Sequence, residues 1–178
     1  MERRGLALVT MHARRRQEQA LRSRIAQTFK VDLPGRPAFV TGSGIAFVGL
    51  GPQSWLVMSK ADTPSFHGSF RSLVNGTASV SDQSGGYAVF RVGGGAIRDT
   101  LAKGFPIDLD DRAFKSGDAA TTIVSHIGAT IWRREDAPDG TACFEISLFR
   151  SLAHSFWHWF SESAAEYGLT WQDLPAAP

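Results

Sequence analysis

Apolar and polar positions along the chain follow two periods, which predict an alternation of strands and helices. Short runs rich in β-branched and aromatic residues predict strands, at residues 5–13, 44–51, 54–59, 87–92, 121–135 and 142–149. The run 121–135 is expected to form two strands hinged near Gly128. Apolar residues three or four positions apart predict helices, at residues 14–29, 66–74, 94–104 and 151–167. Helices alternating with short hairpins favour an α+β fold with a mostly antiparallel sheet.

The last predicted helix holds the densest aromatic group of the chain, HSFWHWF at residues 154–160. Helical periodicity defines an expected core stripe of Leu152, Phe156, Trp159, Phe160, Ser163 and Tyr167. His154, His158 and Glu162 line the opposite side, but a metal site also needs groups that orient its ligands, so no metal is predicted here. Trp157 borders the stripe, and Trp is enriched at interface hot spots. His154, Trp157 and His158 are therefore the candidate partner interface.

Composition bounds the class of protein. The chain has 178 residues, of which 43% are hydrophobic and 20% charged, which is ordinary for a globular protein. This length fits one domain, or one compact fold with two lobes. A run of about 20 apolar residues is absent from the sequence, so no membrane span is predicted. Cys143 is the single cysteine and cannot form an internal disulfide, which indicates a cytoplasmic location.

Charge is distributed unevenly along the chain. Residues 1–30 hold eight Lys or Arg and two Glu, a balance of +6, within a chain whose net charge is +2. This basic strand and helix are expected to be an integral part of the domain and to offer a docking surface to an acidic partner. A phosphate-binding role in an RNA-binding protein is the alternative, but Phe29 is the only aromatic residue in the segment. Nucleic acid is therefore not the favoured partner.

The residues alone predict no catalytic, cofactor-binding or metal site. The glycine run in RVGGGAIRDTL, residues 91–101, lacks the spacing of a nucleotide-binding loop and reads as a strand-to-helix connection. The remaining candidates are Asp108, Asp110, Asp111, His126 and Cys143. Acidic runs in loops are usually solvated. No nucleophile motif accompanies the histidine, and a cysteine within a strand is by default a buried, unreactive thiol.

Three stretches in order carry a family resemblance: LGPQSWLVMS at 50–59, LAKGFPIDLDDRAFKSG at 101–117 and FEISLFRSLAHSFWHWFSESAAEYG at 144–168. Together they resemble the gamma subunits of heterotetrameric sarcosine oxidase. The resemblance covers residues 5–168, which it implies form a single domain, with residues 169–178 as a flexible tail. The wider group resembles the aminomethyltransferase of the glycine cleavage system. This implies ferredoxin-like sheet lobes, like those of the folate-binding domain of that enzyme.

The resemblance also implies a function. The complete oxidase would demethylate sarcosine to glycine with O2 and, with tetrahydrofolate, would make methylene-tetrahydrofolate. FAD, FMN, NAD and zinc would be carried by the alpha, beta and delta subunits, and this chain would be a non-catalytic accessory subunit. Trp157→Ala is then expected to weaken assembly more than it weakens the isolated fold.

The alternative function is a free-standing folate-dependent one-carbon (aminomethyl) transferase, or a folate-binding module. It would need a carboxylate to hold the folate and a buried pocket. In the aminomethyltransferase group an aspartate has this role, but the corresponding stretch here, SHIGATIWRRE, has no Asp between Ser125 and Arg134. The sequence therefore favours the accessory subunit.

Overall fold

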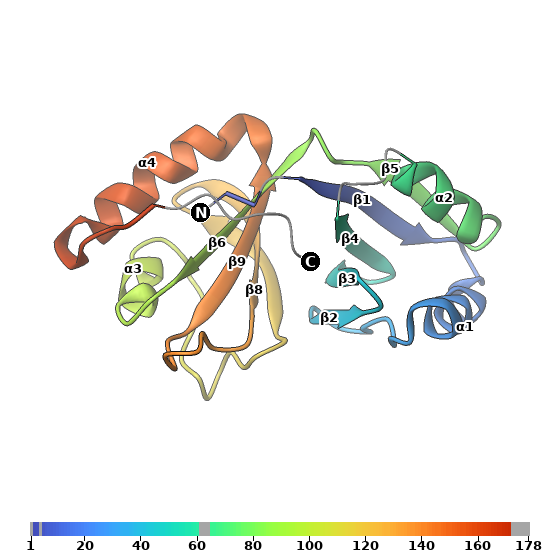
Figure 1. Ribbon diagram of the computed structural model, residues 1–178, viewed down its shortest axis with the longest axis horizontal. Coiled ribbons are helices and arrows are strands. Elements are labelled where there is room, and N and C mark those ends of the chain that lie inside the picture. Colours follow the sequence, from blue (N-terminus) through green and yellow to red (C-terminus); the bar gives the residue numbers. More distant parts are fainter. Residues whose placement is uncertain (1, 4, 61–64, 172–178) are drawn as a thin grey trace. The chain divides into compact units, whose positions relative to one another are not determined.

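The computed structural model describes residues 2–3, 5–60 and 65–171, and the chain divides into two compact units. Of the described residues, unit 1 comprises 2–3 and 86–171, and unit 2 comprises 5–60 and 65–85. Each unit has an antiparallel sheet and two α-helices (Figure 1). The predicted α+β class with mostly antiparallel sheet is confirmed. A single domain over residues 5–168 stays a prediction.

Unit 2 contains a five-stranded sheet in the spatial order β2-β3-β4-β1-β5. Its strands are β1 (Leu6–Ala13), β2 (Phe39–Gly42), β3 (Ile45–Gly51), β4 (Ser54–Lys60) and β5 (Ala78–Asp82). Helix α1 (Glu18–Phe29) follows β1, and α2 (Phe66–Leu73) precedes β5. The order β3-β4-β1-β5, with one helix after β1 and one before β5, is the ferredoxin-like arrangement expected of a lobe. Strands β2 and β5 were not predicted, because their four and five residues are too few to show a clear period.

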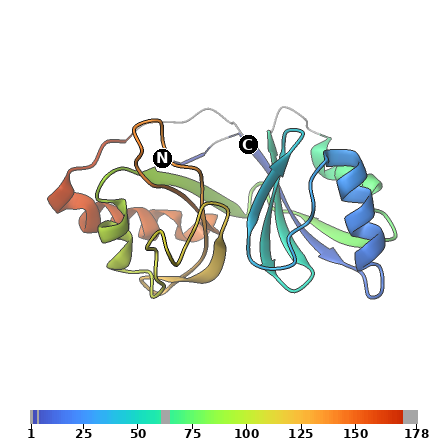
Figure 2. The same ribbon diagram turned by 90° about the horizontal axis from the view of Figure 1, so that it is seen from below.

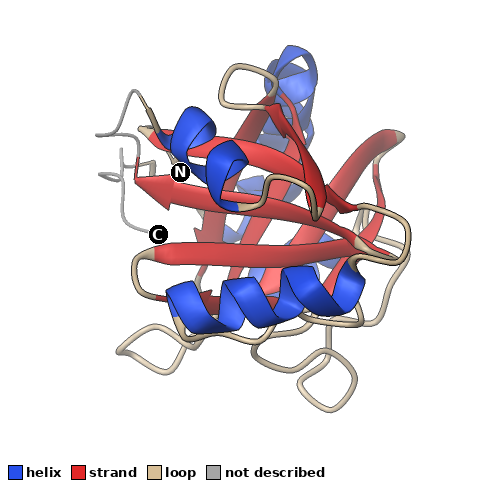
Figure 3. Cartoon of the chain, turned by 90° about the vertical axis from the view of Figure 1, so that its right-hand side faces the viewer, coloured by secondary structure: helices blue, strands red, loops and turns tan. Residues whose placement is uncertain are grey.

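The core of unit 2 lies between its sheet and both helices, which cover the same face (Figures 2 and 3). Alternate residues of a strand point to one face, so Met11 and Phe47 meet Ile25 of α1 and Phe70 of α2 in one buried cluster. Trp55 is also buried there, and its Nε1 donates to the Pro34 carbonyl oxygen at 3.0 Å. This bond satisfies the one polar atom of the indole ring.

Unit 1 contains a four-stranded sheet in the order β6-β9-β8-β7. Its strands are β6 (Tyr87–Gly93), β7 (Ala119–Val124), β8 (Ile127–Arg133) and β9 (Cys143–Phe149). The helices are α3 (Ile97–Ala102) and α4 (Ala153–Ala164), and α4 lies between the short 3-10 turns η1 (Arg150–Leu152) and η2 (Ala165–Tyr167). Both α-helices contribute to one core with the sheet (Figure 2). Among the described residues, no helix has the length and apolar character needed to cross a membrane.

The two ends of the described chain both contribute to unit 1. Glu2 forms a β-bridge with Phe90, and the Arg3 amide donates to the Val89 carbonyl oxygen at 2.7 Å, so the first residues extend along β6. At the other end Trp171 packs against α4. The expected flexible tail, residues 169–178, stays a prediction, since residues 172–178 lie outside the described part.

The turn between β7 and β8 differs from the sequence prediction, which put the hinge near Gly128. The chain reverses at Ser125 and His126, whose φ angles are 43° and 73°. Two consecutive positive φ angles form the tight turn whose twist suits an antiparallel hairpin. Gly128 lies within β8. The prediction was wrong by two to three residues because it assumed that the glycine would supply the left-handed conformation.

Candidate functional site

Helix α4 is held to the core by the aromatic stripe that its periodicity predicts. Phe156 and Phe160 are 1% and 5% exposed, and the Phe156 ring lies 5.0 Å from that of Phe90 on β6. Trp159 is partly buried and packs edge-on against Phe105 at 6.2 Å. Tyr167, which the stripe also included, is 43% exposed. That expectation was wrong because α4 ends at Ala164 and a 3-10 turn, with a different angle per residue, follows.

The candidate interface residues occupy different environments on α4. His154 and His158 are exposed, whereas Trp157 is half-buried and packs against the core. The Trp157 ring lies 6.2 Å from that of Phe160 and 4.5 Å from that of Trp171. Trp157 is therefore a supported ring at the edge of the core rather than a freely projecting side chain.

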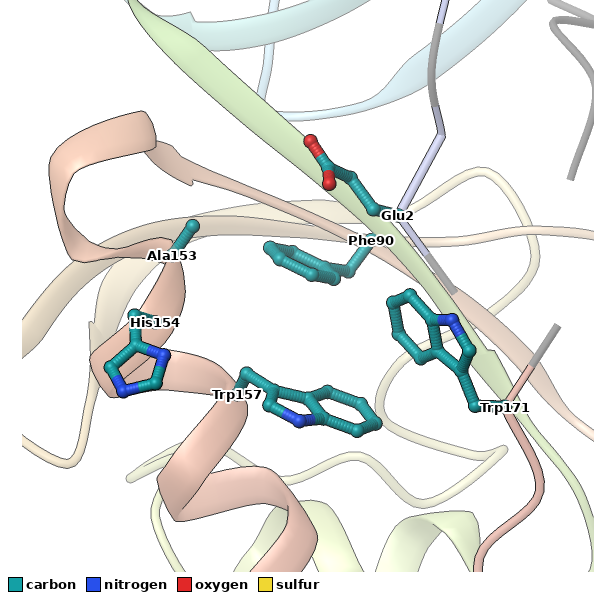
Figure 4. Close-up of a pocket in the computed structure, with 6 residues that line it drawn as sticks. All are labelled: Glu2, Phe90, Ala153, His154, Trp157 and Trp171. Atoms are coloured by element: carbon teal, nitrogen blue, oxygen red, sulfur yellow. The ribbon is translucent and has the colours of Figure 1, made fainter. Parts of the chain in front are cut away.

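A hollow of about 340 Å³ opens beside α4, within unit 1. Its walls are Glu2, Phe90, Ala153, His154, Trp157 and Trp171 (Figure 4). Two of the three candidate interface residues, His154 and Trp157, thus line one surface feature, and His158 is not among its lining residues. Sequence reasoning missed Glu2, Phe90 and Trp171, because they come from the two ends of the chain and from β6.

A buried charge cluster lies on the second face of the unit 1 sheet, opposite the face that packs against α4. Glu145 is 0% exposed, and its Oε1 accepts bonds from Arg3 Nη1 at 2.8 Å and from Arg91 Nη2 at 2.7 Å. Its Oε2 accepts a bond from Trp132 Nε1 at 2.9 Å and lies 3.9 Å from Arg134 Nη1. These charge-assisted bonds offset the cost of burying a carboxylate.

Arg3 is the most deeply buried cation of this cluster, with a side chain 1% exposed. Burial lowers the pKa of its guanidinium from the usual value, and Glu145 opposes that effect, whereas Arg91 and Arg134 add to it. The guanidinium stays charged at neutral pH because an arginine pKa is so high. The bond to Glu145 thus links Arg3 to β9.

The other candidate residues from the sequence lie in ion pairs, in a turn or at the start of a strand. Asp110 pairs with Arg112, and Asp111 pairs with Arg98 and Arg133. His126 forms the exposed β7–β8 turn. Cys143 is the first residue of β9 and is half-buried rather than buried, and burial raises the pKa of its thiol. Across residues 2–3, 5–60 and 65–171, no three His, Cys, Asp or Glu side chains gather in a way that could hold a metal ion.

This two-sheet α+β fold is shared with two solved structures. Heterotetrameric sarcosine oxidase from Corynebacterium sp. U-96, in complex with pyrrole 2-carboxylate, matches with a TM-score of 0.78 and 23% identity, over 96% of this chain and 85% of that one. Glycine cleavage system aminomethyltransferase T from Bartonella henselae matches with a TM-score of 0.64 and 11% identity, over 90% of this chain and 44% of that one. At these identities the similarity shows the fold, as expected from the resemblance to the aminomethyltransferase group.

The family follows from the sequence itself. The model of the sarcosine oxidase, gamma subunit family matches residues 15–166, most of the chain. The chain belongs to this family, which confirms the resemblance seen in its motifs. No curated protein matches the sequence.

Proposed function

We propose that the chain is a non-catalytic accessory subunit of a heterotetrameric sarcosine oxidase. Its membership of the gamma subunit family supports this, as does its similarity in fold to a chain of a heterotetrameric enzyme. The complex would act in the cytoplasm and demethylate sarcosine to glycine with O2 and tetrahydrofolate. Alpha, beta and delta partner subunits would carry the FAD, FMN, NAD and zinc.

The docking role is supported by the difference between the two sides of α4, one of which is buried and the other exposed. Phe156 and Phe160 fix one side of the helix in the core, while His154 and His158 project from the exposed side. An exposed helix face on a rigid support loses little conformational entropy on binding, which favours association. We therefore assign His154 and His158, with Trp157 at their edge, to the interface with a partner subunit.

A second docking surface would lie in unit 2. Arg14, Arg15 and Arg16 are consecutive and exposed between β1 and α1. Like charges side by side attract a surface of opposite sign and speed the encounter with it. An acidic surface of a partner subunit is the complementary match.

A tagged copy of the chain, purified under native conditions, tests the accessory role. The expected result is recovery of three partner chains, flavin absorbance and peroxide formation that depends on sarcosine. A chain that comes out alone, monomeric and with bound folate would instead support the one-carbon transferase alternative.

The interface is tested with the double variant His154→Glu and His158→Glu, which should lose the partner chains while keeping its folded circular dichroism spectrum. His126→Asn is the matched control, because it removes an exposed histidine of unit 1 at a site with φ 73° that asparagine tolerates. Trp157→Ala is less selective, since the ring also contacts Phe160 and Trp171. Retention of all partners by the double variant would rule out this face.

A further inference from the structure

The hollow beside α4 is walled by three aromatic rings from three separate segments. Phe90 comes from β6, Trp157 from α4 and Trp171 from the chain after η2, and in Figure 4 they surround a common space. The two indole rings stand edge to face, with centroids 4.5 Å apart and planes at 67°. They therefore form two adjoining walls at a steep angle to each other.

Two of these walls are held in place by the core. Phe90 is 4% exposed and packs against Phe156 at 5.0 Å, and Trp157 packs against Phe160 at 6.2 Å. Trp171, which is 42% exposed, leans on Trp157. A ligand would thus meet the supported Trp157 ring, the small exposed part of Phe90 and the Trp171 ring at the rim, and the two supported rings would need little ordering on binding.

A carboxylate lies at the edge of the same hollow. Glu2 is placed by its β-bridge to Phe90, and its Oε1 accepts a bond from Arg150 Nη1 at 2.8 Å. Arg150 Nη2 also donates to the Tyr87 carbonyl oxygen at 2.7 Å, which fixes the pair. Arg150 offsets part of the carboxylate charge, so Glu2 alone would not hold a strongly hydrated ion such as a bare ammonium.

We propose that this hollow binds a methylated ammonium group. Ring faces carry a negative quadrupole, and Trp attracts cations more strongly than the other aromatic residues. Methyl groups fill an apolar space and make the cation cheaper to dehydrate, while Glu2 supplies the remaining electrostatic attraction. The volume of about 340 Å³ is at the small end for a ligand pocket, which fits a small alkylammonium compound. The proposal goes beyond the accessory role and concerns residues of unit 1 alone.

Choline and its neutral analogue 3,3-dimethylbutan-1-ol provide the test, because they share a shape and differ in charge. Each is titrated into the full-length chain while tryptophan fluorescence or methyl NMR shifts are followed. Choline is expected to bind at least about fivefold more tightly than the alcohol. Equal affinities would show an apolar pocket with no preference for cations, and absence of saturable binding would show no site. Either result overturns the proposal, and neither affects family membership or partner recovery.

Three variants locate the site. Trp171→Leu should weaken choline binding about fivefold or more, and Trp171→Phe should restore most of it, because an aromatic face remains. Glu2→Gln keeps the shape and should lower the affinity for choline but not for the alcohol. Phe149→Leu is the control, since Phe149 is an exposed ring of unit 1 that stacks on Tyr87 away from the hollow. Trp171 is 42% exposed and its ring contacts that of Trp157 at the edge of the core, so Trp171→Leu should leave the fold intact. Unchanged choline binding by this variant would refute the site.

Discussion

Unit 1 and unit 2 share one plan, an antiparallel sheet with two helices on one face, yet they differ in where their charges lie. In unit 2 the Glu18–Arg22 pair joins successive turns of α1 at 3.1 Å, with the two side chains 39% and 26% exposed. In unit 1 Glu145 has no exposed surface and pairs with Arg3, which is nearly as buried. Both units thus carry ion pairs at their surfaces, as Asp110–Arg112 in unit 1 and Glu18–Arg22 in unit 2 show, but unit 1 also contains a buried charge cluster.

The difference shows which unit depends on polar contacts for its stability. Removing a charge from water costs several kcal/mol, and a buried pair recovers this only when all its bonds are made. An exposed pair costs and contributes little. Unit 1 is therefore expected to tolerate changes at its buried carboxylate poorly, whereas unit 2 should depend mainly on apolar packing.

The largest effect is expected for Glu145→Gln. The neutral amide keeps the size of the side chain but leaves Arg3 as a buried cation without a counter-ion, which should lower the free energy of unfolding by about 3–5 kcal/mol. Urea denaturation followed by circular dichroism measures this change.

Glu18→Gln in unit 2 is the matched control. It removes the carboxylate of an exposed i,i+4 pair and should change stability by less than about 0.5 kcal/mol. Similar losses for Glu145→Gln and Glu18→Gln would show that the two units do not differ as described.

Steric contacts provide the next test, with one glycine in each unit. A Cβ on Gly49 would lie 2.5 Å from the Arg36 carbonyl oxygen, and one on Gly104 would lie 2.4 Å from Cζ2 of Trp159. Backbone yields less than a ring at the edge of a core, so Gly49→Ala should cost about 3 kcal/mol and Gly104→Ala about 1–2 kcal/mol. Gly128→Ala, with nothing within 4 Å of the new atom, is the control in thermal unfolding. A larger loss for Gly104→Ala than for Gly49→Ala would contradict this ranking.

The sequence predicted which faces of its helices and strands are apolar, because these depend on residues only a few positions apart. The spacing of Phe156 and Phe160 identified the buried side of α4, because a helix repeats its faces over a few residues. In a strand the faces alternate at every residue. The stretch FEISLF, residues 144–149, therefore places Glu145 and Ser147 on one face of β9 and Phe144, Ile146 and Leu148 on the other. Such alternation normally places the polar residues of an antiparallel strand on a solvated face, so the pattern of β9 did not signal that Glu145 is buried.

The rest depends on contacts between distant parts of the chain. Arg3 and Glu145 are 142 positions apart, and no periodicity relates them. The hollow likewise needs Glu2 and Trp171 to meet α4 from opposite ends of the sequence. Trp157 was correctly placed at the border of the stripe, but its neighbour Trp171 belonged to a segment expected to be a flexible tail. Long-range pairing of this kind is set by tertiary packing, which a single sequence does not reveal.

A smaller effect is expected for Trp132→Phe in unit 1. It removes the bond from Nε1 to Glu145 Oε2, 2.9 Å long and buried, while the arginine bonds to the carboxylate remain. Loss of one bond to a buried charged group should cost about 2 kcal/mol. Urea denaturation of Trp132→Phe, Glu145→Gln and the double variant forms a cycle. Additive losses would show that the indole and the carboxylate are not coupled.

The smallest effect concerns surface turns, where the two units should behave alike. The Ser84 amide donates to Asp82 in unit 2, and the Thr141 amide donates to Asp139 in unit 1, both at 2.9 Å. Hydrogen bonds from Ser84 lower the pKa of Asp82 below its ordinary value of 3.8, and those from Thr141 lower the pKa of Asp139 in the same direction.

A carboxyl group whose pKa is lower in the folded state stabilises the fold above its unfolded pKa, and this contribution disappears as the pH falls through the folded pKa. Asp82→Asn and Asp139→Asn should therefore each reduce the loss of stability that acid causes below about pH 4. NMR titration of both carboxyl groups checks the direction of their pKa shifts. Two midpoints below 3.8 would confine the difference between the units to their buried charges, whereas a midpoint above 3.8 at either turn would show that the units also differ at their surfaces.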